Sequence, residues 1–308
     1  MRPMAASMLW PPLFNFAVGD AVKHPLQDAT RTANYLKQFA YQWYCKFDRG
    51  TDVDALLPYL PETDLEFVYP QATLKTLPDL LTYARGTFRA ISRSAHCLRD
   101  VSVFPMGQPG TYELLCPHEY HAKLENGDYV TMQLVGRMHV RLGEANAHDP
   151  MGQLPKIHGY KVLMLQPPLP GSAERIDSER HGSFLVNEAK AFVHEWFRLI
   201  DAGDADALMS MVGDGPLSIN ILGNSIDNAA ALKAFLIMQR DIQSYSSHVP
   251  MAIQVARGEN GSFQVTFLLH FEGAIGTQPP MFLSNCTRWT LVPSDGVLKL
   301  AGYTLDLL

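Results

Sequence analysis

Apolar side chains recur at helical spacing in two distant parts of the chain. Each series predicts an amphipathic helix, because residues three and four positions apart lie on the same helix face. An Asp-x-Gly sequence follows each series, and glycine suits the left-handed position just past the end of a helix. The apolar positions are Leu36, Phe39, Ala40, Trp43 and Phe47 in the first helix, and Ala189, Phe192, Trp196 and Ile200 in the second.

The same succession of elements follows both helices. A short helix, a strand and a third helix come next, and long antiparallel strands close each part, with tight hairpins indicated by Asn126-Gly127 and Asn260-Gly261. We therefore expect the α+β class, with three helices packed on one face of a curved antiparallel sheet in each part. The short helices are expected at 53–60 and 205–212, the strands at 65–70 and 217–222, and the third helices at 76–91 and 228–242.

Identical residues in the same order indicate that the two parts are copies of one domain. The pattern Phe-x3-Trp-x4-Asp-x-Gly, followed by Asp-Ala-Leu, occurs in Phe39–Leu56 and again in Phe192–Leu208. One such match would carry little weight, but several in one order are typical of an internal repeat. Further matching pairs are Ser94 and Ser246, His96 and His248, and Arg137 and Arg288.

The repeat divides the chain into four segments. The apolar residues near the N-terminus, Trp10, Phe14 and Phe16, are expected to lie in an arm that packs on a domain. A Pro-rich and then charged stretch between the copies has the composition of a linker. The expected segments are the arm 1–27, the first domain 28–165, the linker 166–184 and the second domain 185–308.

This succession, with an early "W…D.GD.DAL" and a late "RWTLVPSDGVLKLAGY", resembles the nuclear transport factor 2-like superfamily, and within it the SnoaL-like branch. The resemblance implies two tandem cone-shaped domains that form an internal pseudo-dimer, since members often dimerise through their sheets. It also implies a small pocket between the helices and the concave face of each sheet. Members include ketosteroid isomerase, scytalone dehydratase and polyketide cyclases, and also transport adaptors without enzymatic activity.

Composition and charge narrow the classes of partner. The net charge is −6 and no Lys/Arg-rich run occurs, so no nucleic-acid partner is expected. No stretch approaches the roughly 18 consecutive apolar residues of a membrane span, so no membrane partner is expected either. The four cysteines are scattered without a Cys-x-x-Cys pair, which predicts reduced thiols and a cytoplasmic location.

Strand alternation separates the two faces of the central strands. In the second copy the face with Phe267, Leu269 and Phe271 is wholly apolar and is expected to point inward. The matching face of the first copy carries His118 and Tyr120 instead. Burying a histidine without partners costs on the order of a few kcal/mol. The first copy is therefore expected either to enclose a polar pocket or to supply His118 with a hydrogen-bond partner.

The expected chemistry of this pocket centres on His118. His118 is the expected general base, with Tyr44 and Tyr120 as proton donors, and Tyr44 stands where the second copy has Phe197. No catalytic motif of the resembled families maps onto the chain residue by residue. The expected ligand-binding residues are Trp43, Tyr69, Tyr112, Cys116, Met132, Asn285 and Trp289.

Other interpretations of these residues stay open. No metal site is expected at "CPHEYH", because His118 and His121 point to opposite faces of a strand, and no cofactor is expected. A buried His118 that bonds only to a tyrosine or to the main chain is the alternative to catalysis. His96 recurs as a histidine even in the apolar copy, which favours a structural role for it. Arg137 and Arg288, on the outer faces, are expected to pair across the contact between the domains.

The leading hypothesis is a small-molecule-binding protein whose first domain acts as a cofactor-independent lyase, isomerase or cyclase. Proton transfer would take place on an apolar, polyketide- or terpenoid-like substrate, as the resemblance implies, and the second domain would support the first. The alternative is a non-catalytic module that binds a ligand or a protein on a pseudo-dimeric scaffold. The sequence decides neither between these two nor whether the chain forms a further homo-oligomer.

Overall fold

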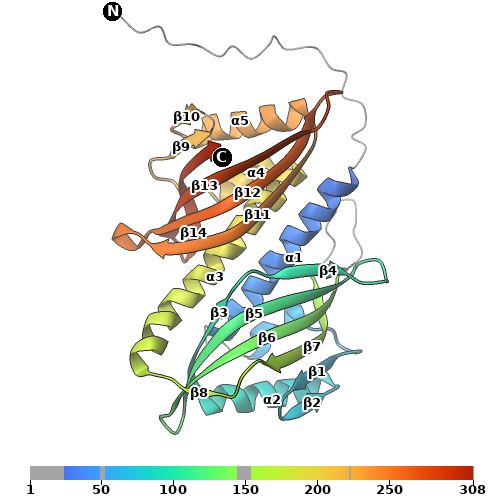
Figure 1. Cartoon of the computed structure of the whole chain (residues 1–308), viewed down its shortest axis with the longest axis vertical. Helices are drawn as coiled ribbons and strands as arrows, with labels where there is room; N and C mark the ends of the chain where they lie inside the picture. Colours follow the sequence, from blue (N-terminus) through green and yellow to red (C-terminus); the bar gives the residue numbers. More distant parts are fainter. Residues whose placement is uncertain (1–23, 49–52, 144–153, 222, 308) are drawn as a thin grey trace, which may run out of the picture.

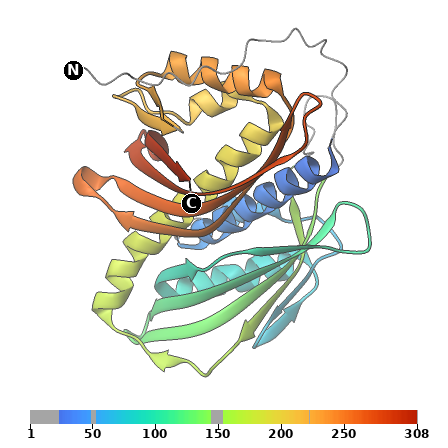
Figure 2. The ribbon, with the colours of Figure 1, turned by 45° about the horizontal axis from the view of Figure 1, so that its top comes forward.

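Two α+β halves stack on one another, with one long helix of each half between the two sheets (Figure 1). Figure 2 shows the same arrangement from a second direction. The computed structural model describes residues 24–48, 53–143, 154–221 and 223–307. Trp10, Phe14 and Phe16 of the expected arm lie outside these residues. Within the described ranges, no helix is both long enough and apolar enough to cross a membrane.

The first half is built on one mixed sheet. Its strands lie in the order β2-β1-β7-β6-β5-β3, with β4 paired to β5 and β8 paired to β6. Only β1 and β7 pair in parallel, and the other neighbours are antiparallel. The elements are α1 (Pro25–Asp48), the 3-10 helix η1 (Val53–Tyr59), β1 (Glu66–Tyr69), β2 (Ala72–Leu74), α2 (Leu77–Ala90), β3 (Ile91–Leu98), β4 (Ser102–Pro105), β5 (Thr111–Leu124), β6 (Tyr129–Arg141), β7 (Lys156–Met164) and β8 (Leu169–Pro170).

The second half repeats this plan on a sheet with the order β10-β9-β14-β13-β12-β11. Each of its α-helices has a counterpart in the first half, and its long strand β11 spans the positions of β3 and β4, so the expected α+β class is confirmed. Residues 173–184, the later part of the expected linker, belong to α3. The elements are α3 (Ala173–Ala202), α4 (Ala205–Ser210), β9 (Ser218–Ile221), β10 (Asn224–Ile226), α5 (Ala229–Ile242), β11 (Gln243–Arg257), the 3-10 helix η2 (Glu259–Gly261), β12 (Phe263–Ile275), β13 (Met281–Ser294) and β14 (Val297–Leu307).

Local sequence signals fix the helix ends in both halves. Before α2, the Thr76 hydroxyl oxygen accepts a hydrogen bond from the main-chain N–H of Asp79 at 3.3 Å. Before α5, the side-chain oxygen of Asn228 accepts one from the N–H of Ala231 at 2.8 Å. Such caps satisfy N–H groups that the first helical turn leaves unpaired. Gly203 follows α3 with a φ of 70°, the left-handed conformation that the Asp-x-Gly sequence predicts.

The halves meet through α1 and α3, which pack against each other along the middle of the molecule (Figure 1). Each of these helices also contacts the edge strand of the opposite sheet, α3 against β3 and α1 against β11. An edge strand presents unpaired main-chain N–H and C=O groups that need a cover. Each half therefore supplies a helix that covers the sheet edge of the other.

The expectation that Arg137 and Arg288 pair across this contact is wrong. Arg137 bonds to Glu113 within the first sheet, and Arg288 pairs with Asp306 within the second. Both arginine side chains are about half exposed, at 45% and 59%. The reason is geometric, because the halves join by helices and sheet edges while these arginines lie on the outer faces of the sheets.

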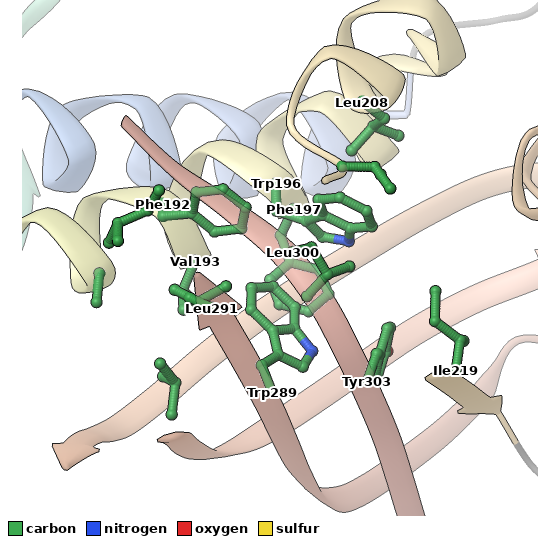
Figure 3. Close-up of a cluster of buried hydrophobic side chains, with 14 of the residues drawn as sticks. Phe192, Val193, Trp196, Phe197, Leu208, Ile219, Trp289, Leu291, Leu300 and Tyr303 are labelled. Carbon is green, nitrogen blue, oxygen red and sulfur yellow. The ribbon is translucent and has the colours of Figure 1, made fainter. Parts of the chain in front are cut away.

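Aromatic side chains fill the interior of the second half (Figure 3). Trp289 is 1% exposed, and its ring centroid lies 5.0–6.0 Å from those of five other aromatic rings. The sequence assigned Trp289 and Asn285 to ligand binding, but both lie buried in this half, where Asn285 accepts a hydrogen bond from Thr287 at 2.8 Å. The five surrounding rings are those of Phe192, Trp196, Phe197, Phe267 and Tyr303.

Replacing Trp289 with alanine is expected to lower the free energy of unfolding by about 4 kcal/mol, because the change removes a large ring from a packed core. Urea denaturation followed by circular dichroism measures the difference. Phe282→Ala on the same strand is the matched control, since this side chain is 71% exposed and its loss should cost less than about 0.5 kcal/mol. Equal losses for the two variants would contradict a filled core around Trp289.

Candidate functional site

The first half encloses a cavity of about 740 Å³ beside its own hydrophobic core. Small-molecule sites typically span about 300–1,000 Å³, so the cavity is large enough for a ligand of two or three fused rings. The last turns of α1, the face of α2 and the inner faces of β3, β5, β6 and β7 contribute its lining.

A buried carboxylate joins the end of α1 to the edge strand β3. Asp48, the last residue of α1, accepts a hydrogen bond from the main-chain N–H of His96 at 2.8 Å, and its other oxygen lies 2.6 Å from Nδ1 of the same histidine. The Asp48 side chain is fully buried, and that of His96 is 13% exposed. Because the carboxylate holds Nδ1–H, the lone pair of His96 is on Nε2, and this ring lines the cavity.

Three more rings gather around this pair on the cavity wall. The ring centroid of His96 lies 5.1 Å from that of Tyr44, 5.4 Å from that of His118 and 4.6 Å from that of Tyr120. Tyr44 and His118 are themselves 5.0 Å apart. Three separate elements, α1, β3 and β5, supply these residues. The fold therefore concentrates two imidazoles and two phenols at one end of the cavity.

His118 is a neutral histidine in this cluster. Its Nδ1 lies 2.8 Å from the carbonyl oxygen of Cys116, which can only accept, so Nδ1 carries the proton. The pKa of His118 is lowered from the usual 6.5 to about 3, mainly by burial. The neighbouring His96 also lowers this pKa, and the hydrogen bond to Cys116 raises it by a smaller amount. Nε2 of His118 is thus available as a hydrogen-bond acceptor at neutral pH. It is a poor group for taking up a proton.

A pair of tyrosine hydroxyls provides protonated donors. The hydroxyl oxygens of Tyr44 and Tyr160 lie 3.1 Å apart, and burial raises the pKa of both groups well above 10. Gly136 on β6 makes room for the pair, since a Cβ at this position would lie 2.0 Å from the Tyr44 oxygen. The glycine is therefore required by a close approach of the Tyr44 side chain rather than by its own backbone conformation.

The second half keeps the carboxylate–histidine pair but has lost the polar groups around it. Asp201 lies 2.5 Å from Nδ1 of His248, and the His248 ring stacks on Phe197 at 5.3 Å. A smaller cavity of about 310 Å³ remains beside Asp201, partly lined by the first turns of α1. The replacements are Tyr44 by Phe197, His118 by Leu269, Tyr120 by Phe271 and Gly136 by Thr287, and Tyr160 is kept as Tyr303.

The structure brings together only part of the residue set chosen from the sequence. Cavity-lining members of that set are Tyr44, Tyr69, His118, Tyr120 and Met132. Trp43, Tyr112 and Cys116 pack into the core cluster of the first half and are not among the lining residues, and Asn285 and Trp289 belong to the other half.

Asp48, His96 and Tyr160 are the functional candidates that sequence reasoning missed. The internal repeat did contain a signal for these residues. Asp48 recurs as Asp201 near the end of a helix, His96 recurs as His248, and Tyr160 follows a glycine as Tyr303 does. The recurrence of His96 in the apolar copy favoured a structural role over a catalytic one. Among the residues described, no three His, Cys, Asp or Glu side chains are grouped so as to hold a metal ion.

Gly136→Ala is expected to lower the free energy of unfolding by about 1–3 kcal/mol, because the new methyl group overlaps the Tyr44 hydroxyl. In a Tyr44→Phe background the same change should cost much less, since the overlapping oxygen is gone. Urea unfolding of the wild type, the two single variants and the double variant gives the coupling energy. Additive effects would contradict the close approach.

His118 is expected to make the protein less stable in mild acid. Its pKa is lower in the folded than in the unfolded chain, so above pH 6.5 both states are neutral and the residue contributes nothing. Between pH 6.5 and about 3, His118 binds a proton in the unfolded chain but not in the folded chain, which favours unfolding.

His118→Leu, which copies the second half, should therefore recover about 2 kcal/mol of the stability that the wild type loses between roughly pH 7 and 5. Urea midpoints at the two pH values measure this difference. His270→Gln serves as the control because His270 is an exposed histidine on the outer face of β12. An unchanged pH dependence in His118→Leu would contradict the lowered pKa.

No protein-family model matches this chain, and no curated protein matches it. Among solved structures, a candidate scytalone dehydratase of Novosphingobium aromaticivorans is 13% identical over 40% of this chain and 84% of that protein, with a TM-score of 0.38. A nuclear transport factor 2-like superfamily protein of Salmonella enterica is 11% identical over 41% and 92%, with a TM-score of 0.39. An NTF2-like protein with a cystatin-like fold from N. aromaticivorans is 15% identical over 44% and 90%, with a TM-score of 0.38.

Each of these alignments spans less than half of this chain, and the likeness carries no argument about activity. Both halves show the order of helices and strands on which the sequence resemblance was based. The α+β arrangement expected from the sequence for each half is therefore confirmed.

Proposed function

We propose that the first half binds an apolar small molecule and catalyses cofactor-independent proton transfer on it. The observation that carries the proposal is the Asp48–His96 pair on the wall of a 740 Å³ cavity that also holds protonated tyrosines. The second half keeps the pair but fills the space before it with Phe197 and Phe271. His96 thus lines the 740 Å³ cavity, whereas His248 is not among the residues that line the 310 Å³ cavity of the second half.

The proposed reaction begins at a carbon next to a carbonyl group. His96 Nε2 takes a proton from this carbon, the C–H electron pair moves into an enolate, and Asp48 stabilises the imidazolium that forms. One hydroxyl of the hydrogen-bonded Tyr44–Tyr160 pair donates to the enolate oxygen, while the other donates to its tyrosine partner. When a hydroxyl group sits one carbon further along, the carbonyl re-forms, the C–O bond breaks and the imidazolium protonates the departing hydroxide to give water. When a carbon–carbon double bond lies at that position instead, the enolate is conjugated with it, the imidazolium returns the proton to the far carbon of that double bond, and the double bond moves next to the carbonyl.

His96 suits the role of base better than His118, to which the sequence assigned it. A histidine with a pKa of about 3 holds a proton too weakly to remove one from carbon at neutral pH. The ring of His96 bonds to a carboxylate, whereas that of His118 bonds to a main-chain carbonyl. His118 and Tyr120 then complete the polar end of the cavity, where His118 accepts a hydrogen bond from a substrate hydroxyl.

The remaining walls favour a flat, apolar substrate of the polyketide or terpenoid type. Tyr69 stacks on Tyr83 with ring centroids 4.6 Å apart, and Phe47 meets Phe88 edge-on at 5.6 Å. Met132 adds a flexible apolar contact on the opposite side. The net charge of −6 supports a small-molecule partner, and the four cysteines, which form no disulfide, support a reducing, cytoplasmic location.

Hydrogen exchange on a model ketone tests the proposal without knowledge of the natural substrate. In deuterated water, the wild type should accelerate exchange of the protons beside the carbonyl of α-tetralone, a bicyclic ketone that the cavity can hold, as followed by proton NMR. His96→Gln should lower this protein-dependent rate by about 100-fold or more, because general-base catalysis contributes about 10²–10⁴-fold.

His248→Gln is the matched control, since it removes the equivalent histidine from the half without the cavity, and its rate should stay within about twofold of the wild type. Equal losses in the two histidine variants would count against the proposal. Saturation-transfer NMR on the same samples reports binding. Binding of α-tetralone without any catalysed exchange would instead support the alternative, a non-catalytic ligand-binding module.

A further inference from the structure

We infer that the second half positions the catalytic histidine of the first, through Asn187 and Lys190 of α3. This inference rests on the proposed function and assigns a role to the half that has no large cavity. Neither residue reaches the cavity, so both are positioning residues that act through the main chain of β3.

The position of His96 on an edge strand creates the need for such a contact. β3 is the last strand of its sheet and pairs with β5 on one side only. Three main-chain groups of β3 bond to side chains: the N–H of His96, the C=O of His96 and the C=O of Leu98. They therefore lie on the free edge of the sheet. Unpaired groups there would be exposed or would leave the strand free to shift.

Side chains from both halves occupy this edge. The N–H of His96 donates to Asp48 of the first half at 2.8 Å, while its C=O accepts from Nδ2 of Asn187 at 2.7 Å. Two residues further on, the Leu98 C=O accepts from Nζ of Lys190 at 2.8 Å in a buried bond. Asp48 thus holds His96 from within its own half, and α3 holds the same residue from the other half.

Loss of the Asn187 bond would leave His96 tied to α1 alone. The bond between Asp48 and the imidazole depends on where β3 lies relative to the end of α1. A small displacement of β3 would move Nε2 away from its reacting position while leaving the cavity and its aromatic walls in place. Misplacement of about 1 Å can cost about 100-fold in rate without weakening binding.

The pseudo-symmetric contact supplies a built-in control. Nδ2 of Asn34 on α1 donates to the C=O of His248 at 2.9 Å, as Asn187 does to His96. Asn34 also accepts from His194 at 2.9 Å, while the side-chain oxygen of Asn187 has no hydrogen-bond partner among the described residues. Truncating Asn34 therefore removes more bonds than truncating Asn187, but it acts on the histidine of the filled half.

The test compares Asn187→Ala with Asn34→Ala in the full chain by the α-tetralone exchange assay. Asn187→Ala should lower the exchange rate at saturating ketone about tenfold or more, with an unchanged half-saturating concentration. Asn34→Ala should stay within about twofold of the wild type, although it costs at least as much thermal stability by circular dichroism. A rate for Asn187→Ala within twofold of the wild type, or equal losses in both variants, would overturn the inference.

Lys190→Met gives a second route if Asn187→Ala does not fold. Burial already lowers the pKa of Lys190, so an uncharged side chain of similar length should be tolerated there. The exchange rate of Lys190→Met at saturating ketone should also fall. Lys37→Met changes the lysine at the corresponding position of α1, and its exchange rate should not fall. If His96→Gln exchanges as fast as the wild type, the proposed function itself fails. If His96→Gln is slow and neither α3 variant is, only the positioning role fails.

Discussion

Each half depends on one interaction, a buried carboxylate that ends the first helix and bonds to a histidine on the edge strand. Asp48 and Asp201 are both fully buried, and each bonds to the main-chain N–H and the ring of its histidine. A buried charge without such partners would cost several kcal/mol, so the bonds fix where the helix ends relative to the sheet. The angle between helix and sheet, and with it the space enclosed, follows from this attachment.

That shared attachment explains how one fold contains both a cavity and a solid core. The histidine must face the interior in both halves, because the carboxylate that holds it comes from the helix above the sheet. Its surroundings then decide what it can do. With Phe197 and Phe271 against it, His248 is a packed structural residue. With Tyr44, His118 and Tyr120 around it, the same geometry places a lone pair beside an open cavity.

Much of the fold could be predicted from the sequence, because repeats, caps and periodicity are local signals. Strand parity correctly separated His118 from His121, which bonds to Thr131 on the other face. Parity tells which way a side chain points but not whether space remains there, and so Trp289 and Asn285 could be taken for ligand-binding residues. Free volume depends on the summed packing of residues distant in sequence. The Tyr44–Tyr160 pair, which needs Gly136, was hidden for the same reason.

The contact between the halves means that neither half could be lost or rebuilt independently of the other as their sequences diverged. Because α3 covers the edge of β3 and α1 covers the edge of β11, removal of either half would expose a sheet edge of the other. The second half could therefore carry apolar side chains where the first half has polar ones, which adds buried apolar area, but it could not lose α3. Asn187 and Lys190 bond to main-chain carbonyls, so they constrain the position of β3 without constraining its side chains. The side chains facing the cavity of the first half remain free to change with the ligand while the frame that holds them stays fixed.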